Sequence, residues 1–110
     1  MSPKRQRESG DPGVSVQEKP KTRPKLEQPK RYKVLLHNDD YTPGEFVVQI
    51  LIYVFNKSEA DAVAVMRHAE SHGTAVAGVY TFEIAETKVA EVMKLATEAQ
   101  VPLLCTLEPE

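Results

Sequence analysis

Hydrophobic positions become frequent only after residue 30, and their spacing then changes from one segment to the next. Residues 31–37 combine aromatic, leucine and valine side chains and stop at a turn-forming run at 38–40, which predicts a strand. Residues 43–55 place apolar side chains at helical spacing. Thr42 and Glu45 flank a proline–glycine pair there, so we expect Thr42 to cap this helix in a capping box.

Apolar positions in residues 58–107 also change from helical to strand-like spacing from one segment to the next. Ser58 opens a helical segment that Gly73 ends, because serine favours the N-cap and glycine the left-handed C-cap. Residues 74–84 alternate as a strand does, residues 85–100 return to helical spacing, and residues 103–107 form a last apolar run. The order β-α-α-β-α-β indicates an α+β domain in which helices cover one face of a three-stranded sheet. The pattern leaves the strand order open.

Composition divides the chain at the same point. Residues 1–31 hold nine Lys/Arg against four acids, whereas residues 32–110 hold five against twelve. Only four apolar residues, but five of the eight prolines, lie in the first 31 positions. A segment so poor in apolar surface cannot bury a core. We therefore expect a flexible, basic, Pro-rich extension over residues 1–30 and one folded domain over residues 31–110.

Several classes of protein are disfavoured by these patterns. The longest apolar run, residues 46–55, is too short to span a bilayer, and the N-terminus lacks the apolar segment of a secretory signal. The four acids of the extension argue against a plastid transit peptide. The single cysteine, Cys105, fits a reducing compartment and is expected in the core. The acidic domain disfavours nucleic-acid binding. We expect a cytoplasmic monomer of the bacterial type that binds neither membrane nor nucleic acid.

The densest polar cluster of the domain is the run Asn38-Asp39-Asp40. One interpretation is an Asx-type turn that only joins a strand to a helix. The other is a ligand site, because a carboxylate and an amide beside a helix start direct several acceptor oxygens toward one point. Such a set matches the three N–H donors of a primary ammonium group.

Catalytic and metal-binding arrangements are weakly represented. His37 lies near Asp39 and Asp40 in sequence, but no serine or cysteine in a nucleophile context and no glycine-rich phosphate loop accompanies them. His68 and His72 have the i, i+4 spacing of a two-histidine metal face, but alanine follows His68 where a zinc hydrolase has glutamate. We expect no enzyme, no metal and no cofactor. A metal-dependent enzyme built on Asp39 and the two histidines is the alternative that metal analysis would test.

Four ordered segments resemble the ClpS adaptor family of the Clp ATP-dependent protease, and the similarity extends without an evident gap from Tyr32 to Glu108. The segments are Asn38-Asp39-Asp40-Tyr41-Thr42-Pro43 with Glu45-Phe46-Val47-Val48, then Gly78-Val79-Tyr80-Thr81, then Glu83 with Ala85-Glu86-Thr87-Lys88-Val89-Ala90, and last Pro102-Leu103-Leu104-Cys105-Thr106-Leu107-Glu108. The resemblance implies a three-stranded antiparallel sheet packed against three helices. It implies a non-enzymatic adaptor that binds proteins with a free, bulky hydrophobic N-terminal residue (an N-degron). The adaptor would deliver them to the AAA+ unfoldase ClpA, with the N-terminal extension taking part.

The resemblance also assigns roles to individual positions. Asn38 and Asp39 would hold the α-amino group of the substrate. The rim and the side-chain pocket would comprise Asp40, Thr42, Pro43, Gly44, Val47, Met66, Ala69 and Leu103. The surface that docks on the N-terminal domain of ClpA would comprise Tyr41, Glu83 and Lys88.

Two positions depart from the family pattern. Gly44 stands where methionine usually gates the pocket, so we expect a wider pocket that accepts β-branched first residues or tryptophan more readily. Glu70 stands where a histidine commonly helps to hold the α-amino group. A glutamate can also accept from an ammonium, so Glu70 is counted as a third acceptor, with a solvent-facing side chain as the other interpretation. If both changes weaken the pocket, the alternative function is a paralogous modulator that docks on the unfoldase with altered or weak N-degron specificity.

Overall fold

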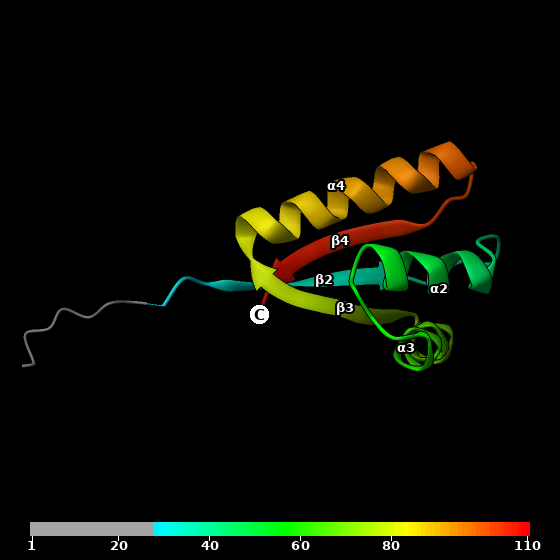
Figure 1. Cartoon of the computed structure of the whole chain (residues 1–110), viewed down its shortest axis with the longest axis horizontal. Coiled ribbons are helices and arrows are strands. Elements are labelled where there is room, and N and C mark those ends of the chain that lie inside the picture. Colours follow the sequence, from blue (N-terminus) through cyan, green and yellow to red (C-terminus); the bar gives the residue numbers. More distant parts are fainter. Residues whose placement is uncertain (1–27) are drawn as a thin grey trace, which may run out of the picture.

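The computed structural model of this chain describes residues 28–110, and the predicted N-terminal extension lies almost wholly outside them. The elements follow the predicted order β-α-α-β-α-β (Figure 1). They are β2 (Arg31–His37), α2 (Gly44–Tyr53), α3 (Glu59–His72), β3 (Thr74–Thr81), α4 (Phe82–Ala99) and β4 (Leu104–Pro109).

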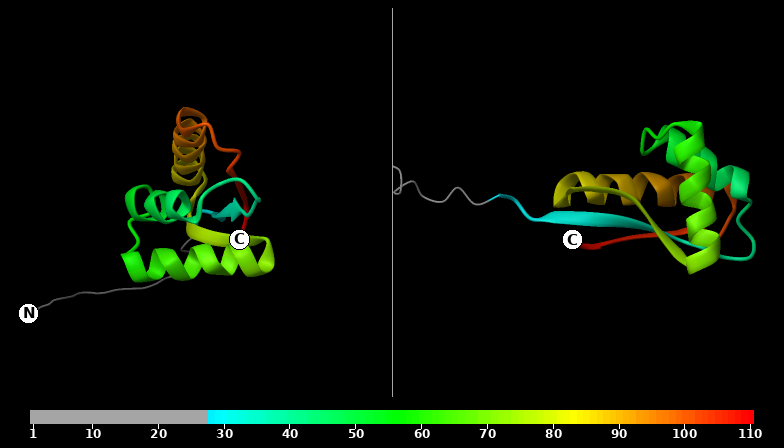
Figure 2. Two further views of the ribbon diagram at one scale, coloured as in Figure 1. Left: turned by 90° about the vertical axis from the view of Figure 1, so that its right-hand side faces the viewer. Right: turned by 90° about the horizontal axis from the view of Figure 1, so that it is seen from below.

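The three strands form one antiparallel sheet with β2 in the centre, in the order β3-β2-β4. A register shift between Val34 and Leu35 leaves Ala77 of β3 as an extra residue opposite them, which is a β-bulge. The helix α4 runs along the sheet, whereas α3 crosses the strand direction near the start of β3 (Figures 1 and 2). The α+β fold and the three-stranded antiparallel sheet predicted from the sequence are confirmed.

The core lies between the sheet and the helices. Its largest fully buried side chains come from the central strand, α2 and α4, and they are Val34, Leu36, Leu51 and Val92. Cys105 on β4 is also buried, as predicted, and burial raises the pKa of its thiol to about 12. Because a thiolate is the reactive form of cysteine, this side chain acts as a small apolar core residue at neutral pH.

The ends of α3 are the ones that the sequence predicted. The Ser58 hydroxyl caps the helix by accepting from the Asp61 backbone N–H at 3.1 Å. Gly73 ends the helix in the left-handed region at φ 89°, where a side chain would be strained.

Three other boundaries were predicted wrongly. Pro43, not Thr42, is the N-cap of α2, and the Thr42 hydroxyl donates to Asp39 instead of capping the helix. Residues 82–84, expected at the end of a strand, form the first turn of α4 because Thr81 already takes the N-cap position. The last strand covers 104–109 rather than 103–107.

The register fixes which loops share an end of the sheet. His37 pairs with Thr74 and with Leu104, so the loop after β2, the end of α3 and the start of β4 meet at one end. Arg31 pairs with Thr81 at the other end, where α4 begins. Since β2 has seven residues, the two ends are about 20 Å apart.

Candidate functional site

The loop between β2 and α2 is organised around the Asp39 carboxylate. Its Oδ1 accepts from the backbone N–H groups of Tyr41 at 2.8 Å and Thr42 at 2.7 Å, and its Oδ2 accepts from the Thr42 hydroxyl at 2.7 Å. The bond to Tyr41 is that of an Asx turn, so the structural interpretation of this polar run is correct for Asp39. It does not exclude a ligand, because a carboxylate has about four acceptor sites and three of them are used.

These hydrogen bonds also keep the carboxylate charged. Desolvation by itself raises the pKa of Asp39, but the bonds from the Thr42 hydroxyl and from the two backbone N–H groups outweigh it. The pKa therefore lies below the ordinary value of an aspartate. Asp39 therefore stays ionised in weak acid, and its Oδ2 keeps one lone pair that can accept a hydrogen bond.

The start of the loop is tied to the end of α3. The backbone N–H of Asn38 donates to the Gly73 carbonyl at 2.8 Å, which holds residue 38 beside the C-terminus of that helix. The Asn38 side chain is exposed, as is that of Asp40. An amide and two carboxylates are thus presented within three consecutive positions at one end of the sheet.

The start of α2 meets the side of α3 at Gly44. A Cβ placed on Gly44 would lie 3.4 Å from both Sδ and Cε of Met66 and 3.9 Å from Oε2 of Glu70. Met66 and Glu70 are four residues apart and so lie on the same side of α3. The structure therefore brings together three of the predicted site residues, two of which belong to the expected pocket and one to the expected ammonium site.

The other predicted pocket residues differ in accessibility. Ala69 and Leu103 are buried at 5% and 2% exposure, so neither forms part of an exposed rim. Val47, one turn after Gly44, is half-buried, and Pro43 is exposed. Leu103 directly precedes Leu104, the partner of His37, which places it at the same end of the sheet as the loop.

An open groove between α2 and α3 includes Met66, but its other lining residues were not predicted. They are Glu45, Val48, Gln49 and Glu59. Only the packing of α3 across α2 shows that they border a depression.

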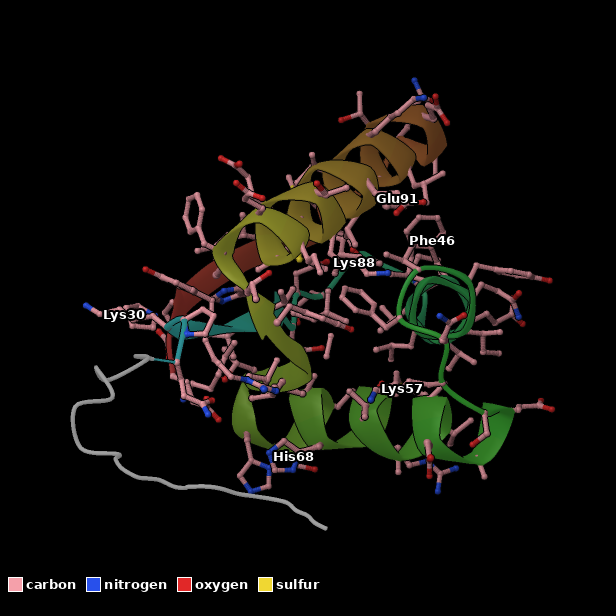
Figure 3. The ribbon with its side chains drawn as sticks, turned by 60° about the vertical axis from the view of Figure 1, so that its left-hand side comes forward. Lys30, Phe46, Lys57, His68, Lys88 and Glu91 are labelled. Atoms are coloured by element: carbon pink, nitrogen blue, oxygen red, sulfur yellow. The ribbon has the colours of Figure 1, made fainter. Side chains whose placement is uncertain are left out.

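The three predicted docking residues do not form one surface. Tyr41 is 80% exposed and lies in the loop at the Asp39 end of the sheet. Glu83 is in the first turn of α4, at the opposite end. Lys88 lies further along α4 and extends toward α2 (Figure 3).

Lys88 is held by contacts that the sequence did not reveal. Its Nζ donates to the Val54 carbonyl at the end of α2 at 2.6 Å and lies 5.7 Å from the centroid of the Tyr80 ring. A cation at a helix C-terminus is favourable because it meets unpaired carbonyls and the negative end of the helix dipole. The Tyr80 ring in turn packs on Phe55 with centroids 6.4 Å apart.

The two histidines of α3 stack on each other. Their ring centroids are 4.1 Å apart, both side chains are exposed, and His68 points away from the sheet (Figure 3). Among residues 28–110, no group of three or more His, Cys, Asp or Glu side chains is placed to hold a metal ion. In the same residues, no helix is both long enough and apolar enough to cross a membrane.

Comparison with known proteins gives consistent matches over the folded domain. The sequence model of the family described as "ATP-dependent Clp protease adaptor protein ClpS" matches residues 27–106. The ATP-dependent Clp protease adapter protein ClpS of Phenylobacterium zucineum (strain HLK1) is 50% identical over 107 residues, which are 96% of this chain and 98% of that protein. The protein of the same name from Maricaulis maris (strain MCS10) is 56% identical over 90 residues, 82% of this chain and 83% of that protein.

One solved structure is similar to this chain in both fold and sequence. The structure of Agrobacterium tumefaciens ClpS2 bound to L-phenylalaninamide superposes with a TM-score of 0.73 at 51% identity, covering 76% of this chain and 100% of that one. The family and these relatives are protease adaptors and not enzymes. The chain belongs to the ClpS family of adaptors of the ATP-dependent Clp protease.

Proposed function

We propose that this adaptor binds the free N-terminus of proteins that begin with a bulky hydrophobic residue and presents them to the ClpA unfoldase. One observation carries the proposal, namely that the ionised Asp39 carboxylate lies at the same end of the sheet as the apolar Met66, Ala69 and Leu103. The relative solved with L-phenylalaninamide supports it, because that ligand carries a free α-amino group and an aromatic side chain.

The recognition chemistry follows from the acceptors of the loop. An ammonium group has three N–H donors, and charge-assisted bonds to a carboxylate are about twice as strong as neutral ones. Asp39 Oδ2 supplies one acceptor, the Asn38 amide oxygen a second, and Glu70 a third. The first side chain would enter between α2 and α3 over Met66 and Ala69, with Asp40, Thr42, Pro43 and Val47 at the rim.

Short fluorescent peptides that begin with Leu, Phe, Trp, Ile or acetyl-Leu test this function by anisotropy. We expect the free bulky termini to bind and acetyl-Leu not to bind, because acetylation removes the charge and one or more donors. Raising the pH from 7 to 9 should weaken binding about tenfold, because the α-amino group loses its proton with a pKa of about 8. Equal binding of Leu and acetyl-Leu peptides would contradict the proposal. Failure of every peptide with docking to ClpA retained would support the modulator function instead.

Delivery rests on a second surface at the other end of the sheet. Glu83 and Lys88 on α4 would contact the N-terminal domain of ClpA, and Tyr41 would form a separate contact near the peptide site. The basic residues 1–30 would take part in delivering the substrate.

We place the protein in the cytoplasm of a bacterial cell as a monomer, without a nucleic-acid or membrane partner.

Two substitutions on α4 distinguish an effect on ClpA docking from an effect on the stability of the fold. Glu83→Gln should weaken binding to the isolated N-terminal domain of ClpA about fivefold without changing the free energy of unfolding, as expected for an exposed charge pair worth about 1 kcal/mol. Lys88→Met should weaken docking and also lower the free energy of unfolding by about 1–2 kcal/mol, because the buried Val54 carbonyl loses its charged donor. Glu98→Gln, at the far end of the same helix, is the matched control. Unchanged docking in both test variants would rule out this surface.

A further inference from the structure

Positions 44 and 70 are far apart in sequence but adjacent in the structure. They are the two positions that depart from the family pattern, and each suggested a separate effect, one on the pocket and one on the ammonium site. The structure places Oε2 of Glu70 3.9 Å from the point where a Cβ on residue 44 would lie. Met66 reaches the same point with its thioether, 3.4 Å away. The space that a side chain at 44 would occupy is therefore bordered by two side chains of α3.

This contact changes the expectation for the pocket. The absence of a side chain at 44 was expected to widen it, but Met66 already borders the vacated space. Methionine is unbranched and flexible, so it adjusts to gaps of irregular shape. The terminal atoms of Met66, rather than an empty volume, therefore face an incoming first residue at the start of α2.

We infer that Gly44 and Glu70 act as a coupled specificity pair, in which the glycine leaves the space through which the Glu70 carboxylate reaches the peptide terminus. The inference rests on the proposed function, because it concerns how the same site holds the α-amino group. A Cβ at position 44 would already be in van der Waals contact with Oε2 of Glu70 at 3.9 Å. A methionine extends three heavy atoms beyond that Cβ, so it would displace the side chains of Glu70 and Met66. Glu70 is an exposed residue, so its carboxylate would then turn wholly into solvent and cease to act as an acceptor.

The start of α2 gives the carboxylate a physical reason to lie there. Pro43 is the N-cap, and its side chain makes no capping hydrogen bond. The N–H groups of Phe46 and Val47 donate to the Pro43 carbonyl, but the N–H groups before them have no acceptor within the helix, and the positive end of the helix dipole attracts a carboxylate. A side chain at 44 would hinder the approach of Glu70 to this end of the helix, whereas glycine leaves it open.

A double-mutant cycle on peptide binding tests the coupling. The dissociation constants of Leu and Phe peptides are measured for the parent chain, Gly44→Met, Glu70→Gln and the double variant, all at low salt. We expect Glu70→Gln to weaken binding about fivefold in the parent, as for an exposed charge pair, and less than twofold when Gly44→Met is also present. Glu86→Gln, an exposed residue near the start of α4 at the opposite end of the sheet, controls for the change in net charge. Circular dichroism confirms that each variant is folded, and Gly44→Ala replaces Gly44→Met if the larger side chain prevents folding.

The outcomes separate this inference from the proposed function. Equal effects of Glu70→Gln in both backgrounds, or no effect in either, would overturn the coupling while free-terminus binding still stands. A parent chain that binds free and acetylated peptides equally would overturn the proposed function and the coupling with it. A loss of Glu70 dependence on adding Gly44→Met, with the Glu86→Gln control unchanged, would establish the pair.

Discussion

Replacing Asp39 by asparagine should weaken the binding of a free-terminus Leu or Phe peptide at least about thirtyfold, because removing one partner of a hydrogen-bonded charge pair costs about 2 kcal/mol or more. The substitution is nearly isosteric, and the asparagine oxygen can still accept from the N–H groups of Tyr41 and Thr42. The amide nitrogen that replaces Oδ2 is a donor, however, and would face the donors of the ammonium group. The loop should therefore keep its conformation but lose affinity for the free N-terminus of the peptide.

The control for this variant is Asp61→Asn, which makes the same chemical change at an exposed site in the first turn of α3. It should leave peptide binding within about twofold of the parent, since an exposed charge far from the loop is screened by solvent and salt. Circular dichroism and thermal unfolding would show whether Asp39→Asn is folded. Parental affinity in a folded Asp39→Asn variant would show that this carboxylate does not hold the terminus.

The pH dependence of unfolding supplies an independent check on Asp39. Its pKa is lowered in the native state, whereas an unfolded aspartate titrates near pH 3.9. The folded state therefore binds this proton more weakly, and Asp39 contributes stability above about pH 4 that is lost as the pH falls through the lower native pKa. The free energies of unfolding of the parent and of Asp39→Asn, measured in urea, should approach each other below the native pKa and differ most above about pH 4.

The elements that could be predicted from sequence are those whose determinants are local. The ends of α3 follow from a serine that caps and a glycine that adopts positive φ, and both signals act within a few residues. The start of α2 shows the limit of such signals. A hydroxyl that caps a helix accepts from a backbone N–H, whereas the Thr42 hydroxyl donates to the Asp39 carboxylate. A hydrogen bond to a charged acceptor is the stronger of the two.

The site was predictable in its residue types but not in its arrangement. The loop at 38–42 is continuous in sequence, so its acceptors could be recognised together. The proximity of Gly44 to Glu70 depends on how α3 crosses α2, which no short-range pattern encodes. The separation of Tyr41 from Glu83 depends likewise on the register of β2 with β3, because it places the two residues at opposite ends of the sheet.

Gly78, the one glycine of the three strands β2, β3 and β4, should not tolerate even alanine, although its backbone does not require glycine. Among residues 28–110, Gly73 is the glycine with positive φ, so Gly78 lies in a conformation that any residue can adopt. A Cβ at Gly78 would nevertheless lie 2.6 Å and 2.7 Å from Cζ and Cε2 of Tyr80, closer than real contacts allow. The ring folds back over the position where the side chain is missing.

Gly78→Ala should therefore lower the free energy of unfolding by about 1–3 kcal/mol, the range for overpacking a filled site. Without the ring, alanine should be the better strand residue, because glycine loses more backbone entropy on folding. The Tyr80→Ala background tests this reasoning, since there the same Gly78→Ala change should be neutral or stabilising. Urea unfolding of the four chains gives the coupling directly, and an equal loss in both backgrounds would contradict a clash with the ring.

The consequence of Gly78→Ala for function follows from what the ring supports. A displaced Tyr80 would leave its contact with Phe55 and uncover Lys88, which now lies over the ring while it donates to Val54. We therefore expect Gly78→Ala to weaken docking to the ClpA N-terminal domain more than it weakens peptide binding, because Gly44 and Asp39 lie at the other end of the sheet. Measuring both affinities on the same variant distinguishes this local effect from general unfolding, which would lower the two in parallel.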